Sequence, residues 1–152
     1  MKRWINYLWP VLLCLAVGFS GSLFQKEAMV EGYPYLVKSS LTPPAIVFPI
    51  VWTVLYVLIG ISLGRLWGKG YKTEVRSWFV QLLLNFSWSI VFFYFHETLG
   101  GFIVILLLDV VVLDYIIQTR KKDRWAMWCF VPYLVWLVLA TYLNAFIYLN
   151  NF

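Results

Sequence analysis

The chain has 152 residues, of which 62% are hydrophobic and only 12% are charged, and its mean hydropathy is +0.80. A soluble domain of this size would expose more charge, so the composition excludes an ordinary soluble protein and indicates a membrane protein. The formal charge of +5 does not indicate nucleic-acid binding, because the basic residues lie in short loops between hydrophobic runs. Cys14 and Cys129 lie inside apolar runs, so no disulfide framework is expected.

Five apolar stretches are long enough to cross about 30 Å of hydrocarbon at about 1.5 Å per residue. They predict an all-α integral membrane protein, one domain over residues 1–152 that forms a five-transmembrane-helix bundle. The helices are expected at about 5–24, 44–66, 76–96, 99–119 and 126–149. The first stretch, which begins MKRW, is expected to be a membrane helix and not a cleaved signal peptide, because no clear A-x-A-like site follows it. The long connection at about 25–43 is expected to be functional or mobile.

The basic residues are divided unequally between the two sides of the predicted bundle. The side opposite the N-terminus has only Lys26 and Lys38. The N-terminal side has ten basic residues: Lys2, Arg3, Arg65, Lys69, Lys72, Arg76, Arg120, Lys121, Lys122 and Arg124. The positive-inside rule therefore predicts a cytoplasmic N-terminus, an outer C-terminus and an outer first loop. We expect a multi-pass protein of the cell membrane.

Proline and threonine mark the predicted second helix. Thr42, followed by Pro43 and Pro44, predicts a helix start with a capping side chain and prolines in the first turn. Pro49 and Pro132 are expected to kink their helices, which neighbouring groups tolerate in a membrane.

Small residues indicate where helices approach closely. Gly60 and Gly64 form a GxxxG pattern, and Gly18, Gly21 and Ser22 form a small-residue patch on the first helix. Both features favour close packing within the bundle, with a dimer seam as the alternative.

Three predicted helices place aromatic and amide side chains on one face, at about 100° per residue. The stripes are Phe48, Trp52, Tyr56 and Gly60 on the second helix; Gln81, Asn85, Trp88, Ser89, Phe92 and His96 on the third; and Tyr133, Trp136, Ala140 and Asn144 on the last. One interpretation is interhelical hydrogen bonding. The other is a pocket for a flat hydrophobic ligand. Trp52, Asn85 and Trp136 lie too deep for the interfacial belt of aromatics, and Ala140 leaves room that leucine would fill, which favours the pocket.

Two carboxylates lie inside the fourth predicted helix, where each costs about 2.5–3.5 kcal/mol on insertion scales. Asp109 and Asp114 differ by about 140° and cannot share one face. Asp114 is expected to reach the interface near Arg120. Asp109 is either a hydrogen-bonded structural residue or the coupling residue of a transporter. His96 is expected to be interfacial, and no metal site is expected.

Three segments carry a resemblance to a known family. They are GYPYLVKSSLTPPAIVFPIVWTVLYVLIG, VQLLLNFSWSIVFFYFH and VPYLVWLVLATYLN. Together with the span pattern, they resemble the TspO/MBR family of tryptophan-rich sensory and translocator proteins, relatives of the peripheral-type benzodiazepine receptor. The resemblance implies a single five-helix TspO/MBR domain, commonly a homodimer in a lipid membrane, with a pocket under the first loop that binds protoporphyrin-type tetrapyrroles. Some bacterial members are reported to degrade protoporphyrin in light.

The matching positions and the stripes together predict the ligand-binding residues Tyr33, Pro43, Phe48, Trp52, Asn85, Ser89, Phe92, Trp136, Ala140 and Asn144. Trp52 and Trp136 are the candidate catalytic residues for photochemistry, in which porphyrin is ligand or substrate and no cofactor is required. The acidic groups of the porphyrin are expected near Lys38. The alternative function is proton-coupled or passive transport of a small hydrophobic substrate.

The chain also departs from the family pattern. Leu41 and Ile46 stand where many relatives have tryptophan, so the outer rim of the pocket is expected to be less aromatic. The sterol-recognition pattern of animal relatives is broken at Ala145 and Leu149, so high-affinity cholesterol binding is not expected.

Overall fold

Five long helices make up most of the chain that the computed structural model describes, residues 3–25 and 33–151. They are α1 (Arg3–Gln25), α3 (Val47–Leu66), α4 (Lys72–Ser89), α5 (Thr98–Arg120) and α6 (Arg124–Asn150). Two short elements join them: η1 (Tyr33–Tyr35) in the first connection and a π-helical turn, η2 (Ile90–Tyr94), which continues α4. All five long helices are apolar enough to cross a membrane. The predicted all-α, five-helix membrane fold is confirmed.

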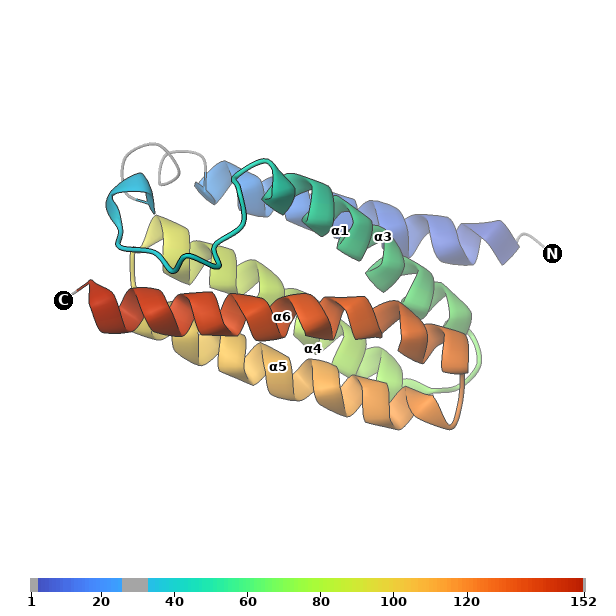
Figure 1. Ribbon diagram of the computed structural model, residues 1–152. Coiled ribbons are helices and arrows are strands. Elements are labelled where there is room, and N and C mark those ends of the chain that lie inside the picture. The colour runs from blue at the N-terminus through green and yellow to red at the C-terminus, as the bar shows by residue number, and fades with distance from the viewer. Residues whose placement is uncertain (1–2, 26–32, 152) are drawn as a thin grey trace.

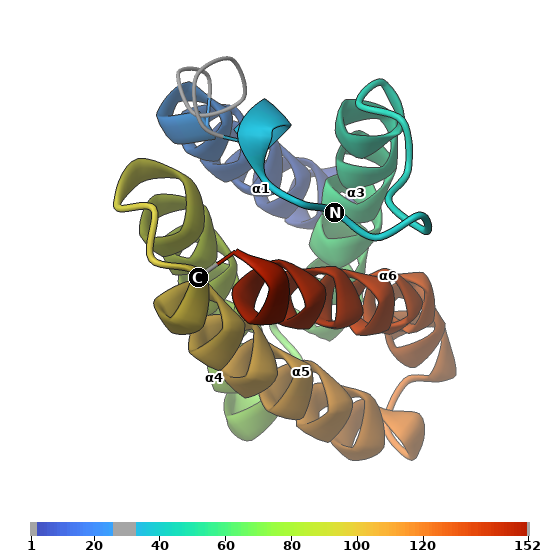
Figure 2. The same ribbon diagram turned by 60° about the vertical axis from the view of Figure 1, so that its left-hand side comes forward.

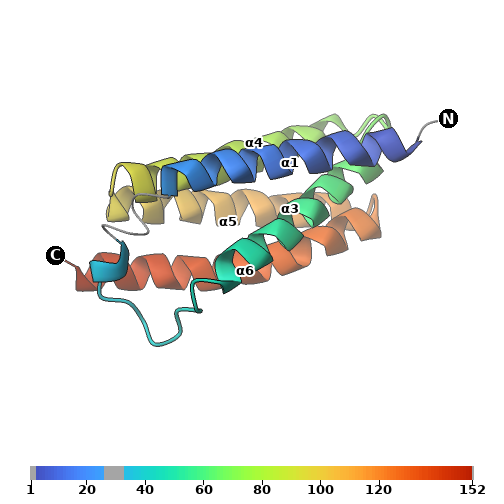
Figure 3. The same ribbon diagram turned by 90° about the horizontal axis from the view of Figure 1, so that it is seen from above.

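The helices form a ring in the order α1, α3, α6, α5, α4, because each packs against the next and α4 closes the ring against α1. Figure 2 shows this ring with α6 and α5 on the side opposite α1. Since five helices cross the bundle, α1 begins at the end opposite to the one where α6 finishes (Figure 1). Seen from above, α3 runs obliquely between α1 and α6 (Figure 3).

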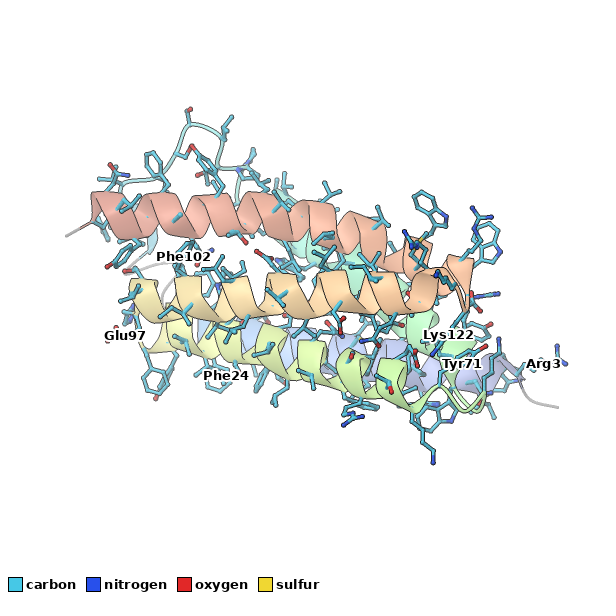
Figure 4. All side chains as sticks on the ribbon, turned by 90° about the horizontal axis from the view of Figure 1, so that it is seen from below. Arg3, Phe24, Tyr71, Glu97, Phe102 and Lys122 are labelled. Atoms are coloured by element: carbon cyan, nitrogen blue, oxygen red, sulfur yellow. The ribbon has the colours of Figure 1, made fainter. Side chains whose placement is uncertain are left out.

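The two ends of the bundle differ in charge. One end, here called the basic end, carries Arg3 and Lys122, whereas Glu97 lies at the other, here called the loop end (Figure 4). The loop end carries the first connection, including Lys38. The described basic residues are thus separated as the sequence predicts, whereas Lys2 and Lys26 lie outside the described part of the chain.

The GxxxG glycines pack inside the bundle, as predicted. A Cβ atom added to Gly60 would lie 2.5 Å from the Cα atom of Val11 on α1. One added to Gly64 would lie 2.9 Å from the carbonyl oxygen of Asn6. That carbonyl lacks its usual helical donor because Pro10, four residues later, has no N–H. The two glycines therefore let α1 and α3 meet backbone to backbone.

The predicted start of the second helix is wrong. Helix α3 begins at Val47, and no side chain caps it. Two turns precede it instead: the backbone N–H of Thr42 donates to the carbonyl of Ser39, and that of Val47 donates to the carbonyl of Pro44. Pro49 consequently lies in the first turn of α3, where its missing N–H costs no hydrogen bond and no kink is needed.

The π-helical turn changes the end of the third span. Its wider winding buries both Phe92 and Phe93, and the chain then turns at His96, whose φ is +56°. Histidine is among the residues that adopt this left-handed conformation comparatively often. The span ends at Tyr94, so His96 does not continue the stripe and its side chain is exposed.

Asp123 organises the basic end. Its carboxylate caps α6 by accepting the N–H of Ala126 at 3.0 Å. It also accepts from Nε of Arg65 at 2.8 Å and lies 3.6 Å from the Lys69 ammonium. Burial alone would raise the pKa of Asp123, but the Arg65 and Ala126 hydrogen bonds and the two positive charges outweigh it, so the pKa lies below its ordinary value of 3.8. This carboxylate therefore ties α3 to α6.

Candidate functional site: two adjoining cavities

Two adjoining cavities lie in the half of the bundle nearer the loop end. The larger, about 590 Å³, is walled by α1, α3 and α4 together with Ala45 of the first connection. The smaller, about 60 Å³, lies between α3, the end of α4 with η2, and α6. Gln25, Phe48, Trp52 and Trp88 line both. The larger volume lies within the range of small-molecule sites, about 300–1,000 Å³.

Trp52 is the centre of the aromatic wall between the cavities. Its ring centroid lies 5.4 Å from that of Tyr56 and 6.2 Å from that of Tyr133. It lies 6.4 Å from that of Trp136, with the planes at 88°. Phe48 also meets Trp136 edge-on, at 5.7 Å. Edge-to-face pairs of this kind are each favourable by about 0.5–1.5 kcal/mol, so they hold the wall in a fixed shape.

A second aromatic group closes the smaller cavity. Trp88 stacks on Phe92 at 5.5 Å and 16° and meets Phe93 edge-on. The indole N–H of Trp88 donates to the side-chain oxygen of Asn144 at 3.1 Å. The amide group of Asn144 donates in turn to the carbonyl of Ala140. The π-helical turn is what places both phenylalanines against α6.

A buried chain of polar groups extends from the wall of the larger cavity. The Tyr56 hydroxyl donates to Oδ1 of Asn85 at 3.0 Å, and Nδ2 of Asn85 donates to the Tyr133 hydroxyl at 2.8 Å. Tyr133 donates to Oε1 of Gln81 at 2.9 Å. Tyr56 and Asn85 line the larger cavity, whereas Tyr133 and Gln81 line neither. The chain therefore joins α3, α4 and α6 directly behind the cavity wall.

The mouth of the larger cavity lies between α1 and α3. Phe19 and Leu23 of α1 line it and are 67% and 59% exposed, and Pro49 and Thr53 of α3 line it and are also exposed. Phe19 and Thr53 lie six residues inside the helix ends at Gln25 and Val47, about 9 Å along each helix. The opening thus extends sideways along helices that are apolar enough to span a membrane.

Part of the first connection is fixed to α6 instead of crossing this mouth. The Ser39 hydroxyl bonds that of Tyr142 at 2.9 Å. The backbone N–H and carbonyl of Val37 both bond the side chain of Asn151. Leu41 and Ile46, the positions where many relatives have tryptophan, are exposed and line neither cavity.

Eight of the ten predicted ligand-binding residues surround the two cavities. Phe48 and Trp52 line both, Asn85 and Ser89 the larger, and Phe92, Trp136, Ala140 and Asn144 the smaller. Pro43 lines neither cavity, because it lies in the turns before α3. The side chain of Tyr33 is outside the described part of the chain. Binding by these residues stays a prediction.

The two interpretations of the polar stripes each describe part of the structure. The amides of Asn85 and Asn144 make hydrogen bonds between helices, as the interhelical interpretation predicted. The aromatic residues of the same stripes wall the cavities. Gln81 shares the stripe of Asn85 but is fully buried in the polar chain.

The contribution of α1 to the larger cavity was not predicted from the sequence. This helix supplies Leu15, Gly18, Phe19, Ser22, Leu23 and Gln25 to the larger cavity. The amide group of Gln25 donates to the Ser89 hydroxyl at 3.1 Å. The small-residue patch at Gly18 and Ser22 was the available signal, but it indicates close packing as readily as a cavity.

The charged groups that the structure describes lie away from both cavities. None of the described lining residues is charged. Nζ of Lys38 donates to the carbonyl of Leu36 at 3.0 Å, and Lys38 lines neither cavity. Asp109 lies behind α6, where the Thr141 hydroxyl contacts it at 2.5 Å. Asp114 is exposed and bonded to Gln118, four residues on, instead of Arg120. Within the described residues, no cluster of His, Cys, Asp and Glu could hold a metal ion.

Comparison with known proteins agrees with the resemblance noted in the sequence. A sequence model of the TspO/MBR family matches residues 10–149. The chain belongs to this family. It is 39% identical over 144 residues to "Tryptophan-rich protein TspO" of Archaeoglobus fulgidus, covering 93% of this chain and 94% of the relative. It is 38% identical over 137 residues to the protein of the same name from Chlorobaculum tepidum, with 87% of each chain covered. It is 28% identical over 139 residues to the human "Translocator protein", covering 88% of this chain and 82% of the relative.

Proposed function

We propose that this TspO/MBR protein binds porphyrins such as protoporphyrin IX, and other flat hydrophobic molecules, in the paired cavities. The observation that carries the proposal is the uncharged aromatic wall formed by Phe48, Trp52 and Trp88, which faces both cavities. Flat apolar rings gain from contact with such faces. Interhelical bonding alone would not require a cavity of about 590 Å³.

The absence of charge on the described lining residues limits how a porphyrin would be seated. A buried carboxylate without a partner is strongly unfavourable. The ring would therefore lie inside, and its acidic groups would point out of the mouth or towards the loop end. Several polar lining groups are already engaged within the protein, for example Tyr56 with Asn85 and Trp88 with Asn144. Binding would thus depend on shape and aromatic contact more than on hydrogen bonds.

The sideways mouth supports access from the membrane. Phe19, Leu23, Pro49 and Thr53 form its edge on two helices that can span a bilayer. A hydrophobic ligand dissolved in the leaflet at the loop end would reach the cavity without crossing water. The basic end would face the cytoplasm of a cell membrane by the positive-inside rule, and a homodimer is the assembly that the family resemblance favours.

Light-dependent degradation of the bound porphyrin is a second candidate function. Trp52 and Trp136 line the smaller cavity with ring centroids 6.4 Å apart, so one ligand could contact both. An indole would give an electron to the excited porphyrin and recover it from a later intermediate, leaving dioxygen as the net oxidant. Nε1 of Trp136 is buried with no hydrogen-bond partner among the described residues, so its radical cation would have no neighbour to take its proton.

A titration with protoporphyrin IX in lipid nanodiscs tests both functions. Tryptophan quenching and the porphyrin absorption band are followed in the dark, and product formation is then followed in light. Trp52→Phe and Trp136→Phe should weaken binding and slow any photoproduct. Trp125→Phe is the matched control, because Trp125 is exposed near the basic end and lines neither cavity. Absence of saturable binding in the wild-type protein would refute the porphyrin proposal, and equal photochemistry in all variants would remove the cavity indoles from the reaction.

A further inference from the structure

Asp109 lies midway along α5 in a setting unsuited to a charged carboxylate. It is half-buried against α6, and its Oδ1 atom is buried with no hydrogen-bond partner in the described part of the chain. No salt bridge among the described residues involves it. An ionised carboxylate at the centre of a membrane helix is costly unless it is paired.

The charged residues of the helices packed against α5 lie too far along the bundle to pair with it. On α4 they are Lys72, Glu74 and Arg76, and on α6 the one charged residue is Arg124. All four belong to the first two turns of their helices, at the basic end. The turn η2 has no charged residue. Among the titratable residues of α6, Tyr133 interacts electrostatically with Asp109.

The single hydroxyl hydrogen of Thr141 decides the protonation state. Oγ1 of Thr141 lies 2.5 Å from Oδ2 of Asp109 and 2.7 Å from the carbonyl oxygen of Leu137. Both are hydrogen-bond distances between oxygen atoms, and each needs a hydrogen between them. A threonine hydroxyl supplies one hydrogen but can also accept. The Leu137 carbonyl has none to give, and one hydrogen shared between two acceptors would not hold both oxygen pairs this close, so the geometry favours a second hydrogen on Asp109.

We propose that Asp109 is a neutral carboxylic acid at neutral pH, and that it holds the cavity-lining turn of α6 in place by donating to Thr141, which donates to Leu137. Thr141 follows Ala140, which lines the smaller cavity. Trp136 and Asn144 line the same cavity within one turn of Ala140. Asp109 thus supports the cavity wall from behind and is a positioning residue, not a ligand contact.

The proposal separates Asp109 from Asp114. Asp114 is exposed, and the amide of Gln118 donates to its Oδ2 atom, which makes Asp114 a hydrogen-bond acceptor. The Gln118 amide also donates to the Ser77 hydroxyl at 3.5 Å, but it carries two hydrogens, so nothing there requires a proton on Asp114. The two aspartates of α5 therefore serve as test and matched control.

Infrared spectroscopy of the protein in nanodiscs tests the protonation state directly. At neutral pH the wild-type protein should show the carbonyl band of a protonated carboxylic acid. The band should be lost in Asp109→Asn and retained in Asp114→Asn. In Thr141→Val it should move to the higher frequency of a carboxylic acid without a hydrogen bond. A wild-type spectrum without the band, or loss of the band in Asp114→Asn but not in Asp109→Asn, would overturn the proposal.

Unfolding measurements test whether Asp109 holds α6 in place or is only tolerated there as a neutral acid. The Asp109→Asn substitution keeps a neutral donor for Thr141, so this variant should match wild type. Asp109→Leu should instead raise the unfolding equilibrium constant about threefold to eighteenfold, the range of one interhelical hydrogen bond. Wild type should also lose stability as pH rises, because its folded state holds a proton that the unfolded chain releases, and Asp109→Asn should not. Equal stability of the Asn and Leu variants would refute the positioning role.

The effect on the cavity rests on the proposed function and can fail separately. The dissociation constant for protoporphyrin IX should rise in Asp109→Leu and stay unchanged in Asp109→Asn. If neither variant nor wild type binds porphyrin, the proposed function fails while the infrared result still decides the state of Asp109. If wild type binds but Asp109→Leu binds equally well, the link to the cavity is refuted.

Discussion

The hydroxyl groups of Tyr56 and Tyr133 allow the supporting and lining parts of the site to be tested apart. Tyr133 is fully buried and its hydroxyl makes two hydrogen bonds, at 2.8 and 2.9 Å. Tyr56 makes one, at 3.0 Å. Replacement by phenylalanine removes only the hydroxyl and leaves the ring in place. The pair is therefore a matched comparison within one hydrogen-bonded chain.

Interhelical hydrogen bonds in membranes average about 0.6 kcal/mol and reach about 1.7 kcal/mol. Tyr133→Phe, which loses two, should lower the free energy of unfolding by about 1.2 kcal/mol, with an upper limit of about 3.4 kcal/mol. Tyr56→Phe should cost about half as much. The larger effect of Tyr133→Phe also reflects two amides, on Asn85 and Gln81, that lose a partner inside the bundle, which is the costly way to break a hydrogen bond.

Ligand binding should follow the opposite order. Tyr56 lines the larger cavity and Tyr133 lines neither. Tyr56→Phe should change the affinity for protoporphyrin IX, while Tyr133→Phe should leave it near the wild-type value under conditions where the protein stays folded. The assays are reversible unfolding in mixed micelles and the quenching titration. If Tyr56→Phe destabilises the protein more than Tyr133→Phe, the assignment of supporting and lining roles is wrong.

Three further predictions concern other parts of the bundle. Gly60→Ala should destabilise the protein strongly, because its Cβ would meet the backbone of Val11 at 2.5 Å, whereas Gly21→Ala, with its nearest contact at 3.3 Å, should be mild when both are compared by thermal unfolding. The low pKa of Asp123 means that its contribution is present above its ordinary value of 3.8 and is lost as pH falls through the lower folded value. Asp123→Asn, which can still cap α6, should therefore lose this acid sensitivity, and Asp123→Ala should cost about 1 kcal/mol more. Ala140→Leu should fill the cavity of about 60 Å³ and raise the dissociation constant for protoporphyrin IX, while the protein still folds. An unchanged dissociation constant would show that the ligand binds elsewhere.

The helices were predictable because long apolar runs leave few alternatives in a membrane, but their ends were less so. The prolines at 43 and 44 look like a helix start, yet the chain makes turns there and α3 begins only at Val47. Pro43 precedes a second proline and therefore disfavours helical geometry, so the helix could not begin at Pro43 with Thr42 as its cap. The π-helical turn was also missed, since a uniform 100° spacing assumes that every turn has the same width.

The sequence predicted those features of the candidate site that depend on which residues share one face of a single helix. Trp52, Asn85 and Trp136 could be placed on inward stripes from spacing alone. What spacing cannot give is the register between helices, which is set by contacts such as that of Gly60 with Val11. For that reason the sequence could not pair the Asn85 amide with the Tyr133 hydroxyl, nor show that α1 supplies a wall.

The polar stripes combine interhelical hydrogen bonds with cavity walls, which explains why both interpretations of them had support. Apolar helices gain little from each other in lipid, so polar groups and close packing must hold a cavity open against collapse. Asn85 and Tyr133 bond behind the wall, and Asp109 and Thr141 make contact on another seam of α6. A cavity walled by indoles therefore needs the amides, hydroxyls and carboxyl that brace its helices. Removal of that bracing should destabilise the bundle even when no lining residue is changed.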